Sequence, residues 1–229
     1  MHYAILLFPG FEALDAFGPL EALNILAEHK KIHLSILSES RDPVTTRYAD
    51  AASHRLGSSC TQEVLPTGTF SEYLSRSNQG DPSLESASEL HKRKIDVLIV
   101  PGGAGTRFLE IIAPVIDFVR ATYPSAQYIL SICNGAGVLA RAGILDGKRA
   151  TTNKLLWEST TALRPQVRWV REARWVSDGN VWTASGVSAG IDATLAFVRA
   201  VYGEELALEI VREMEYVWDA GDGTTDPFA

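Results

Sequence analysis

The stretch Tyr128-Ile-Leu-Ser-Ile-Cys133-Asn134-Gly135-Ala136-Gly137 decides the fold class of this chain. An apolar run passes directly into small residues, which is typical of a buried strand that turns sharply into a helix. Cys133 lies at the turn itself. The pattern is that of a nucleophile elbow, in which the side chain at the turn projects from the end of the strand. The sequence therefore predicts a reactive, nucleophilic cysteine at position 133.

Two effects favour a thiolate at this position. The N-terminus of a helix carries partial positive charge, and backbone N–H groups point toward the sulfur. We therefore expect a Cys133 pKa below about 7, against about 8.5 for a free thiol. The alternative is an inert cysteine buried in the core, which is a common position for free cysteine. Gly135 and Gly137 favour the elbow, because they stand where a tight turn needs small residues.

Outward from the elbow, apolar runs alternate with helical patterns, which predicts a mostly parallel sheet covered by helices on both faces. We expect one α/β domain over residues 1–229, with a polar insert at about residues 75–94. Gly18-Pro19 is expected to separate or kink the first turn of the first helix. Strands are predicted over residues 3–8, 33–37, 95–100, 128–132, 167–170, 174–177 and 181–184, and helices over 13–29, 109–123, 136–142, 188–202 and 204–218.

The composition of the chain disfavours nucleic acid and membranes as partners. The chain has 229 residues, 46% of them hydrophobic, and a net charge of −7, which disfavours nucleic acid and anionic membrane surfaces. No apolar run approaches transmembrane length, and the N-terminal run lacks the basic start of a signal peptide. The two cysteines, Cys60 and Cys133, have no metal-type spacing and do not make a disulfide framework. We expect a cytoplasmic protein that binds a small molecule.

The carboxyl ends of parallel strands are where ligands bind in such sheets. The first strand leads to Asp15, and the strand that ends at residue 100 leads to Gly102 and Gly103. The amides of these two glycines and of Asn134 are predicted to form an oxyanion hole. Further residues are predicted to line the pocket, namely Gly135, Asn153, Ser185 and Gly186.

Taken together and in order, these motifs resemble the ThiJ/PfpI superfamily, of the class I glutamine amidotransferase-like type, and most closely its isonitrile hydratase branch. The resemblance covers nearly the whole chain except roughly residues 40 to 94. The residues that carry it are Phe8-Pro9-Gly10, Leu14-Asp15 with Gly18-Pro19 and Glu21, Asp96 to Gly103, Ser131-Ile132-Cys133 with Gly135, Leu145 to Thr152, and Ala189-Gly190-Ile191-Asp192.

The resemblance implies a flavodoxin-like sandwich, a homodimer, and no metal or organic cofactor. It also implies that an acidic side chain after the first strand is paired with the elbow cysteine. That role falls to Asp15. Glu21 follows nearly two helical turns later and is expected at the helix surface or an interface.

Three departures from the family pattern bear on function. Isonitrile hydratases carry threonine directly after the nucleophile, and PfpI-type peptidases carry histidine, but this chain has Asn134. Many members carry histidine where this chain has Asn153. All five histidines precede Cys133, so a triad with a downstream histidine cannot be built. We expect the longer Asn134 amide to narrow the pocket, which predicts altered hydratase activity and a gain with Asn134→Thr.

Three hypotheses of function follow. The first is a cysteine-dependent hydratase or lyase for a small electrophile, with Cys133 as nucleophile and Asp15 as proton donor and acceptor, acting on isonitriles. The second is a redox sensor or stress-response protein without turnover, in which Cys133 is reversibly oxidised. The third is a glyoxalase or deglycase that acts on 2-oxoaldehydes.

Overall fold

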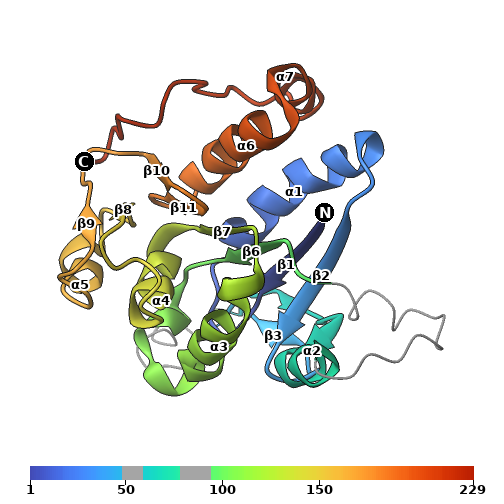
Figure 1. Ribbon diagram of the computed structural model, residues 1–229, viewed down its shortest axis with the longest axis vertical. Helices are drawn as coiled ribbons and strands as arrows, with labels where there is room; N and C mark the ends of the chain where they lie inside the picture. Colours follow the sequence, from blue (N-terminus) through green and yellow to red (C-terminus); the bar gives the residue numbers. More distant parts are fainter. Residues whose placement is uncertain (48–58, 78–93) are drawn as a thin grey trace.

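A mostly parallel seven-stranded sheet lies at the centre of this computed structural model, which describes residues 1–47, 59–77 and 94–229 (Figure 1). The strand order is β10-β11-β7-β6-β1-β2-β5. Neighbouring strands are parallel except β10 and β11, which form the predicted antiparallel hairpin. The strands are β1 (His2–Leu6), β2 (His33–Ser38), β5 (Gly68–Thr69), β6 (Val97–Val100), β7 (Tyr128–Ser131), β10 (Trp175–Asp178) and β11 (Val181–Ala184).

Helices cover both faces of the sheet (Figure 1). One face carries α1 (Ala13–His29), α6 (Ala189–Tyr202) and α7 (Glu204–Glu213), and the other carries α3 (Leu109–Thr122) and α4 (Ala136–Arg141). Beside them lie α2 (Phe70–Ser77) and α5 (Trp157–Thr161). This arrangement confirms the α/β flavodoxin-like sandwich. Within the described ranges, no helix is both long and apolar enough to cross a membrane.

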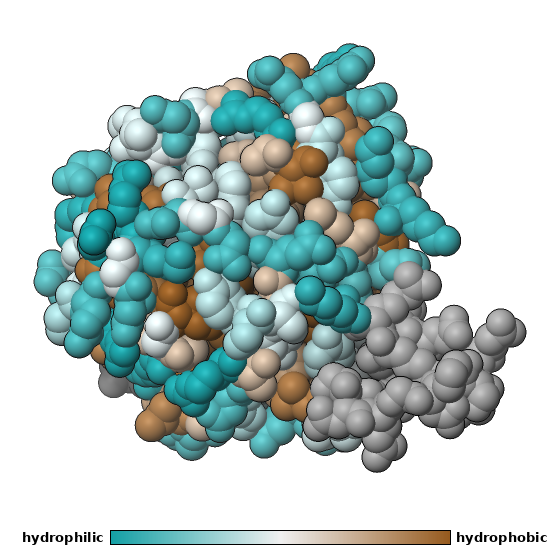
Figure 2. Space-filling model, in the orientation of Figure 1, coloured by the Kyte–Doolittle hydropathy of each residue, from teal (hydrophilic) through white to brown (hydrophobic). Residues whose placement is uncertain are grey.

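Two strands at the centre of the sheet, β1 and β6, are buried along their whole length. All residues of β1 and β6 are buried, which is why their sequences are continuously apolar rather than alternating. The molecular face drawn in Figure 2 is mostly hydrophilic, with apolar side chains in small groups. Because β1, β6 and β7 are adjacent and parallel, the segments that follow them meet at one edge of the sheet. This edge positions the candidate site.

Two short pairs of strands lie outside the central sheet. An antiparallel pair joins β3 (Val44–Thr45) to β4 (Glu63–Val64), and a parallel pair joins β8 (Arg149–Ala150) to β9 (Arg168–Trp169). The strand predicted at residues 167–170 is therefore present as β9 in a sheet of its own. Most of the polar insert predicted at residues 75–94 lies outside the described residues, and only its first part belongs to α2.

The first helix is continuous, which rules out one of the two outcomes predicted for Gly18-Pro19, a separate first turn. The sequence Gly18-Pro19 does not separate the first turn, because α1 continues from Ala13 to His29 with Pro19 inside it. A proline at this place removes one backbone hydrogen bond. Close packing on α6 offsets this loss: a Cβ at Gly18 would lie only 2.8 Å from Cγ1 of Ile191. The glycine therefore lets α1 and α6 approach each other closely.

The last helix is shorter than predicted. It ends at Glu213 rather than residue 218, and Glu215 takes a left-handed φ of 46°. The Tyr216 hydroxyl then donates to Asp192 Oδ1 at 3.1 Å, so this aromatic side chain packs on α6 instead of extending α7. We call residues 215–229 the C-terminal tail. It runs back across the molecule to β10, where the Arg174 N–H donates to Gly223 O at 2.7 Å (Figure 1).

Candidate functional site

Cys133 lies on the turn between β7 and α4 with a left-handed backbone conformation. Its φ is 57°, in a region that costs a non-glycine residue roughly 1 to 2 kcal/mol. The Cys133 N–H donates to Ser185 O at 2.9 Å and fixes the turn to the segment after β11. A Cβ at Gly135 would collide with the backbone oxygens of Val100 and Pro101, so the turn requires glycine there. This is the sharp strand-to-helix turn that the sequence predicts.

Three N–H donors surround the sulfur. The Asn153 side chain donates from Nδ2 to Cys133 Sγ at 3.1 Å. The backbone N–H groups of Asn134 and Val187 also donate to it. The side chain is only 5% exposed. Preorganised donors in a site closed to water stabilise negative charge on the atom they face, so the arrangement favours charge that develops on sulfur.

Asp15 is the acid beside this thiol. It lies in the first turn of α1 and is fully buried. Its Oδ2 accepts a hydrogen bond from the Gly102 N–H at 2.8 Å. Its carboxyl group also interacts with the Cys133 thiol. The structure thus brings together the two residues to which the sequence assigns the chemistry, one from α1 and one from the elbow.

Burial raises the pKa values of both groups. Desolvation raises the pKa of Asp15 to about 7, and the Gly102 hydrogen bond opposes that shift. Desolvation and the charge of Asp15 raise the pKa of Cys133 to about 12, against the effect of its three N–H donors. The lowered thiol pKa expected from the helix terminus is therefore wrong, because burial outweighs the local dipoles. Above pH 7 the pair is a thiol beside a carboxylate, an arrangement in which Asp15 can accept the thiol proton.

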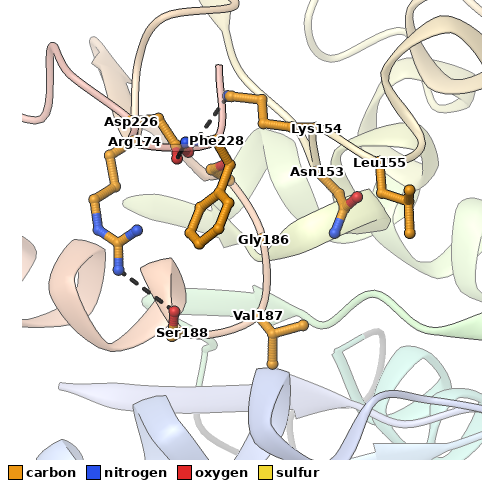
Figure 3. Close-up of a pocket in the computed structure, with 10 residues that line it drawn as sticks. Asn153, Lys154, Leu155, Arg174, Gly186, Val187, Ser188, Asp226 and Phe228 are labelled. Carbon is orange, nitrogen blue, oxygen red and sulfur yellow. Dashed lines mark hydrogen bonds and ion pairs between the residues drawn. The ribbon is translucent and has the colours of Figure 1, made fainter.

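A cavity of about 440 Å³ lies beside the segment that follows β11 (Figure 3). Asn153, Ser185 and Gly186, which the sequence predicts to line the pocket, are in its wall. Asn153 and Val187 line the cavity and also contact the Cys133 sulfur, so the sulfur lies directly behind this wall. The cavity and the thiol thus share these two residues.

The sequence matches the model of the DJ-1/PfpI family over residues 1–200. The chain belongs to the DJ-1/PfpI family. It is 31% identical over 233 residues to the isonitrile hydratase of Pseudomonas putida, an alignment that covers 100% of this chain and 86% of that protein.

Solved structures of the DJ-1/PfpI family share the fold. The crystal structure of a ThiJ/PfpI family protein from Pseudomonas syringae has a TM-score of 0.70 and 26% identity, over 99% of this chain and 81% of that chain. DJ-1beta of Drosophila melanogaster has a TM-score of 0.69 and 19% identity, over 95% of this chain and 98% of that chain. The second comparison supports the fold alone. These relatives agree with the family that the sequence motifs indicate.

In this DJ-1/PfpI protein, the oxyanion hole predicted from Gly102 and Gly103 is wrong. The Gly102 N–H is bound to Asp15, and the Gly103 N–H donates to Asn134 Oδ1 at 2.8 Å. Both amides are therefore engaged within the protein. A Cβ at Gly102 would collide with the Asn134 side chain and approach the Asp15 carboxylate, which explains the glycine there. Of the predicted donors, only the backbone N–H of Asn134 faces the sulfur.

The Asn134 side chain also differs from the expectation that it narrows the pocket. It is buried and forms a reciprocal pair with Gly103, accepting from the Gly103 N–H and donating from Nδ2 to Gly103 O at 3.2 Å. It therefore ties the segment after β6 to the elbow instead of entering the 440 Å³ cavity. Gly135 does not line that cavity either, because it packs against the end of β6. Both residues shape the turn.

Sequence reasoning missed most of the cavity wall. The residues it did not assign are Lys154, Leu155, Arg174, Val187, Ser188, Asp226 and Phe228. Val187 and Ser188 directly follow the assigned Ser185-Gly186, so continuing along that loop would have found them. Asp226 and Phe228 come from the C-terminal tail, for which no periodic pattern gives a signal.

One group of possible metal ligands occurs among the described residues, far along α1 from Asp15. It consists of His29, Glu209 and Glu213 at the surface, where His29 Nε2 lies 3.1 Å from Glu213 Oε1. Nδ1 of the same histidine lies 3.9 Å from Glu209 Oε2. Beside the sulfur of Cys133 lies the carboxylate of Asp15, and the chemistry of this pair is that of a nucleophile with a proton-transfer group.

Proposed function

We propose that this protein is an isonitrile hydratase-like lyase, which adds water to an isonitrile and releases an N-formamide. The observation that carries the proposal is the buried pair of Cys133 and Asp15, whose sulfur accepts hydrogen bonds from two residues of the cavity wall, Asn153 and Val187. The full-length similarity to an isonitrile hydratase supports the same substrate class. The proposal assigns two catalytic residues, Cys133 and Asp15.

The first half of the reaction joins substrate and enzyme. The sulfur of Cys133 attacks the terminal isonitrile carbon, forming a C–S bond, while the Asp15 carboxylate accepts the thiol proton. Asp15 then delivers this proton to the same carbon, which gives a thioimidate, R–N=CH–S–Cys133. The raised pKa of Asp15, about 7, suits a group that must take up and release a proton near neutral pH.

The second half releases the product. Water adds to the thioimidate carbon, one of its protons passes to nitrogen, and the C–S bond breaks. Sulfur leaves with a proton returned through Asp15, and R–NH–CHO is released. In sum, R–NC and water give R–NH–CHO, and no atom changes its oxidation state. The N–H groups of Asn134, Val187 and Asn153 around the sulfur stabilise charge on it during attack and departure.

The geometry supports turnover more than redox sensing. A redox-sensing thiol is accessible and has a low pKa. The Cys133 thiol is 5% exposed, and burial raises its pKa. For 2-oxoaldehydes, the same pair would add sulfur to a carbonyl carbon, and the identity of the product separates that reaction from hydration.

The test is a product assay with purified protein. Isonitriles and methylglyoxal are supplied separately, and N-formamide and lactate are quantified by proton NMR. We expect N-formamide from the natural protein and none from Cys133→Ser. Lactate without N-formamide would assign the protein to the 2-oxoaldehyde class. Neither product, together with rapid oxidation of Cys133 by peroxide, would favour the sensor.

We also propose a cytoplasmic homodimer. Cys60 and Cys133 are free thiols, as expected in a reducing compartment. Leu14 and Phe17 are 42% and 43% exposed on α1, on either side of the buried Asp15. Apolar side chains exposed beside each other favour an interface. Sedimentation velocity on the natural protein and on Phe17→Glu tests this: we expect a dimer that dissociates in the variant.

A further inference from the structure

The rim of the 440 Å³ cavity carries two large apolar side chains that are open to solvent. Leu155 is 91% exposed and Phe228 is 74% exposed. They reach the rim from distant parts of the sequence, since Leu155 precedes α5 and Phe228 lies near the end of the C-terminal tail. In the view of Figure 3, Asn153 lies between them. Asn153 also donates to the Cys133 sulfur, so this side chain connects the apolar rim with the reactive group.

The charged side chains of the cavity are neutralised within the protein. Arg174 donates from Nε to Asp192 Oδ2 at 2.6 Å. Lys154 Nζ lies 3.7 Å from Asp226 Oδ2 and donates to Ala173 O at 2.8 Å. Both carboxylates that pair with these cations are buried. A charged substituent would therefore meet no unpaired countercharge in this part of the cavity. An uncharged substituent would lose little solvation free energy on leaving water for the cavity.

The tail is held firmly enough to place Phe228. The Asp226 N–H donates to Glu172 O at 2.6 Å, and the Phe228 N–H donates to Asp226 Oδ1 at 3.0 Å. Gly223 takes a φ of 76° and lies so close to the Trp175 ring that a Cβ would collide with it. The side chain of Phe228 is exposed, but these contacts fix its backbone beside the cavity. A fixed apolar surface loses little conformational entropy when it binds a ligand.

We propose that Leu155 and Phe228 bind the uncharged, apolar substituent of the substrate and so determine which electrophiles reach Cys133. The inference rests on the proposed function, because the substituent is the R group of the isonitrile. The C–N≡C group then points past Asn153 toward the sulfur. Leu155 and Phe228 are specificity-determining residues and take no part in the chemical steps.

The test uses modification of the thiol, which does not depend on turnover. Only two cysteines occur in the chain, so Cys60→Ser leaves Cys133 as the single target. Second-order rate constants are measured by mass spectrometry for N-phenylmaleimide and N-methylmaleimide, and their ratio is divided by the ratio for a free small thiol. We expect a clear preference for the phenyl reagent. Phe228→Ala and Leu155→Ala should each lower the ratio roughly 5- to 10-fold, as loss of an apolar contact predicts.

Val217→Ala is the matched control. Val217 is 94% exposed in the same tail but does not line the cavity, so its removal should leave the ratio unchanged. All three substituted side chains are exposed, and each variant is checked for its thermal midpoint. Equal ratios in all proteins, or no modification of Cys133 by either reagent, would overturn the proposal.

Two further outcomes separate this inference from the proposed function. If no isonitrile is hydrated but the labelling ratio falls in Phe228→Ala and Leu155→Ala, the hydratase proposal fails and the apolar site stands. If isonitriles are hydrated with equal kcat/KM in all variants and the ratio does not change, the apolar site is rejected alone. A change of sedimentation in Phe228→Ala with no change of ratio would make the rim an interface between copies instead.

Discussion

The pocket at Cys133 has two walls that differ in how they are built. The inner wall, which lies behind the cavity, is the carboxyl edge of β1, β6 and β7, where backbone hydrogen bonds and closely packed glycines hold Asp15 and the turn of Cys133. The outer wall includes the C-terminal tail, which has no regular secondary structure after α7. A few anchors hold it, chiefly Gly223 and Asp226. The inner wall therefore places the reacting groups, and the outer wall decides what is held beside them.

Within the inner wall, the largest loss of activity is expected when the Cys133 thiol is removed. We expect Cys133→Ser to lower kcat/KM for an isonitrile by roughly 10³-fold or more, since a hydroxyl is a far weaker nucleophile in the same geometry. Formamide release measured by NMR is the readout. Retention of even a tenth of the activity would show that the sulfur forms no bond to the substrate.

Replacing the acid is the next largest change. Asp15→Asn should lower kcat roughly 10²-fold, because it removes the proton acceptor while keeping the hydrogen-bond acceptor for Gly102. In the natural protein kcat/KM should rise with pH and level off above about 7, as Asp15 ionises. In the variant this rise should disappear. Glu21→Gln, at an exposed position on the same helix, is the control and should keep both the rate and the profile.

Asp15→Asn should also change how the free energy of unfolding depends on pH. Folding raises the pKa of Asp15 from 3.8 to about 7, so this carboxyl keeps its proton to a higher pH in the folded state than in the unfolded chain. The stability that this carboxyl contributes is complete below pH 4 and is lost as pH rises to 7. Relative to the natural protein, Asp15→Asn should therefore gain roughly 2 to 4 kcal/mol in unfolding free energy between pH 4 and pH 8. Urea unfolding at the two pH values measures this, and a constant difference would contradict the buried, raised carboxyl.

The anchoring of the outer wall is tested most directly at its buried ion pair. Lys154 and Asp226 side chains are 6% and 1% exposed. Asp226→Asn should lower the free energy of unfolding by roughly 1 to 3 kcal/mol, because a buried ammonium loses its carboxylate. Asp222→Asn, at an exposed position in the same tail, should cost little. If the two variants unfold at the same urea concentration, the tail is not anchored by this pair.

The smallest expected effect concerns the link between the inner strands. Asn134→Thr should lower the free energy of unfolding by about 1 to 2 kcal/mol, since threonine cannot replace both hydrogen bonds to Gly103. Hydratase activity should not rise, because the amide lies outside the cavity. A gain in activity at unchanged stability would restore the view, drawn from sequence alone, that this side chain narrows the pocket.

The inner wall could be predicted from sequence because its signals are local. Continuous apolar runs give the strands, and the small residues after Cys133 give the turn. The place of Asp15 follows from the rule that parallel strands end at one edge. What failed were statements about side-chain direction and protonation. Gly102 and Gly103 lie where expected, but their N–H groups are taken by Asp15 and Asn134, which no spacing reveals.

The outer wall could not be predicted, for a different reason. Its contacts join residues far apart in sequence, such as Lys154 with Asp226 and Arg174 with Gly223. The periodic pattern of α7 also continues past its actual end, because Tyr216 and Trp218 are apolar enough to extend it. Only the packing of these aromatic side chains on α6 shows that the helix stops. Long-range contacts of this kind have no local signature.

The left-handed backbone of Cys133 has a consequence for the evolution of such proteins. Glycine would adopt the same φ of 57° without the steric cost that cysteine bears. In a descendant no longer selected for its chemistry, glycine or asparagine should therefore be favoured at this position by backbone conformation. In this chain the cysteine bears that steric cost, which is expected where the sulfur itself has a function.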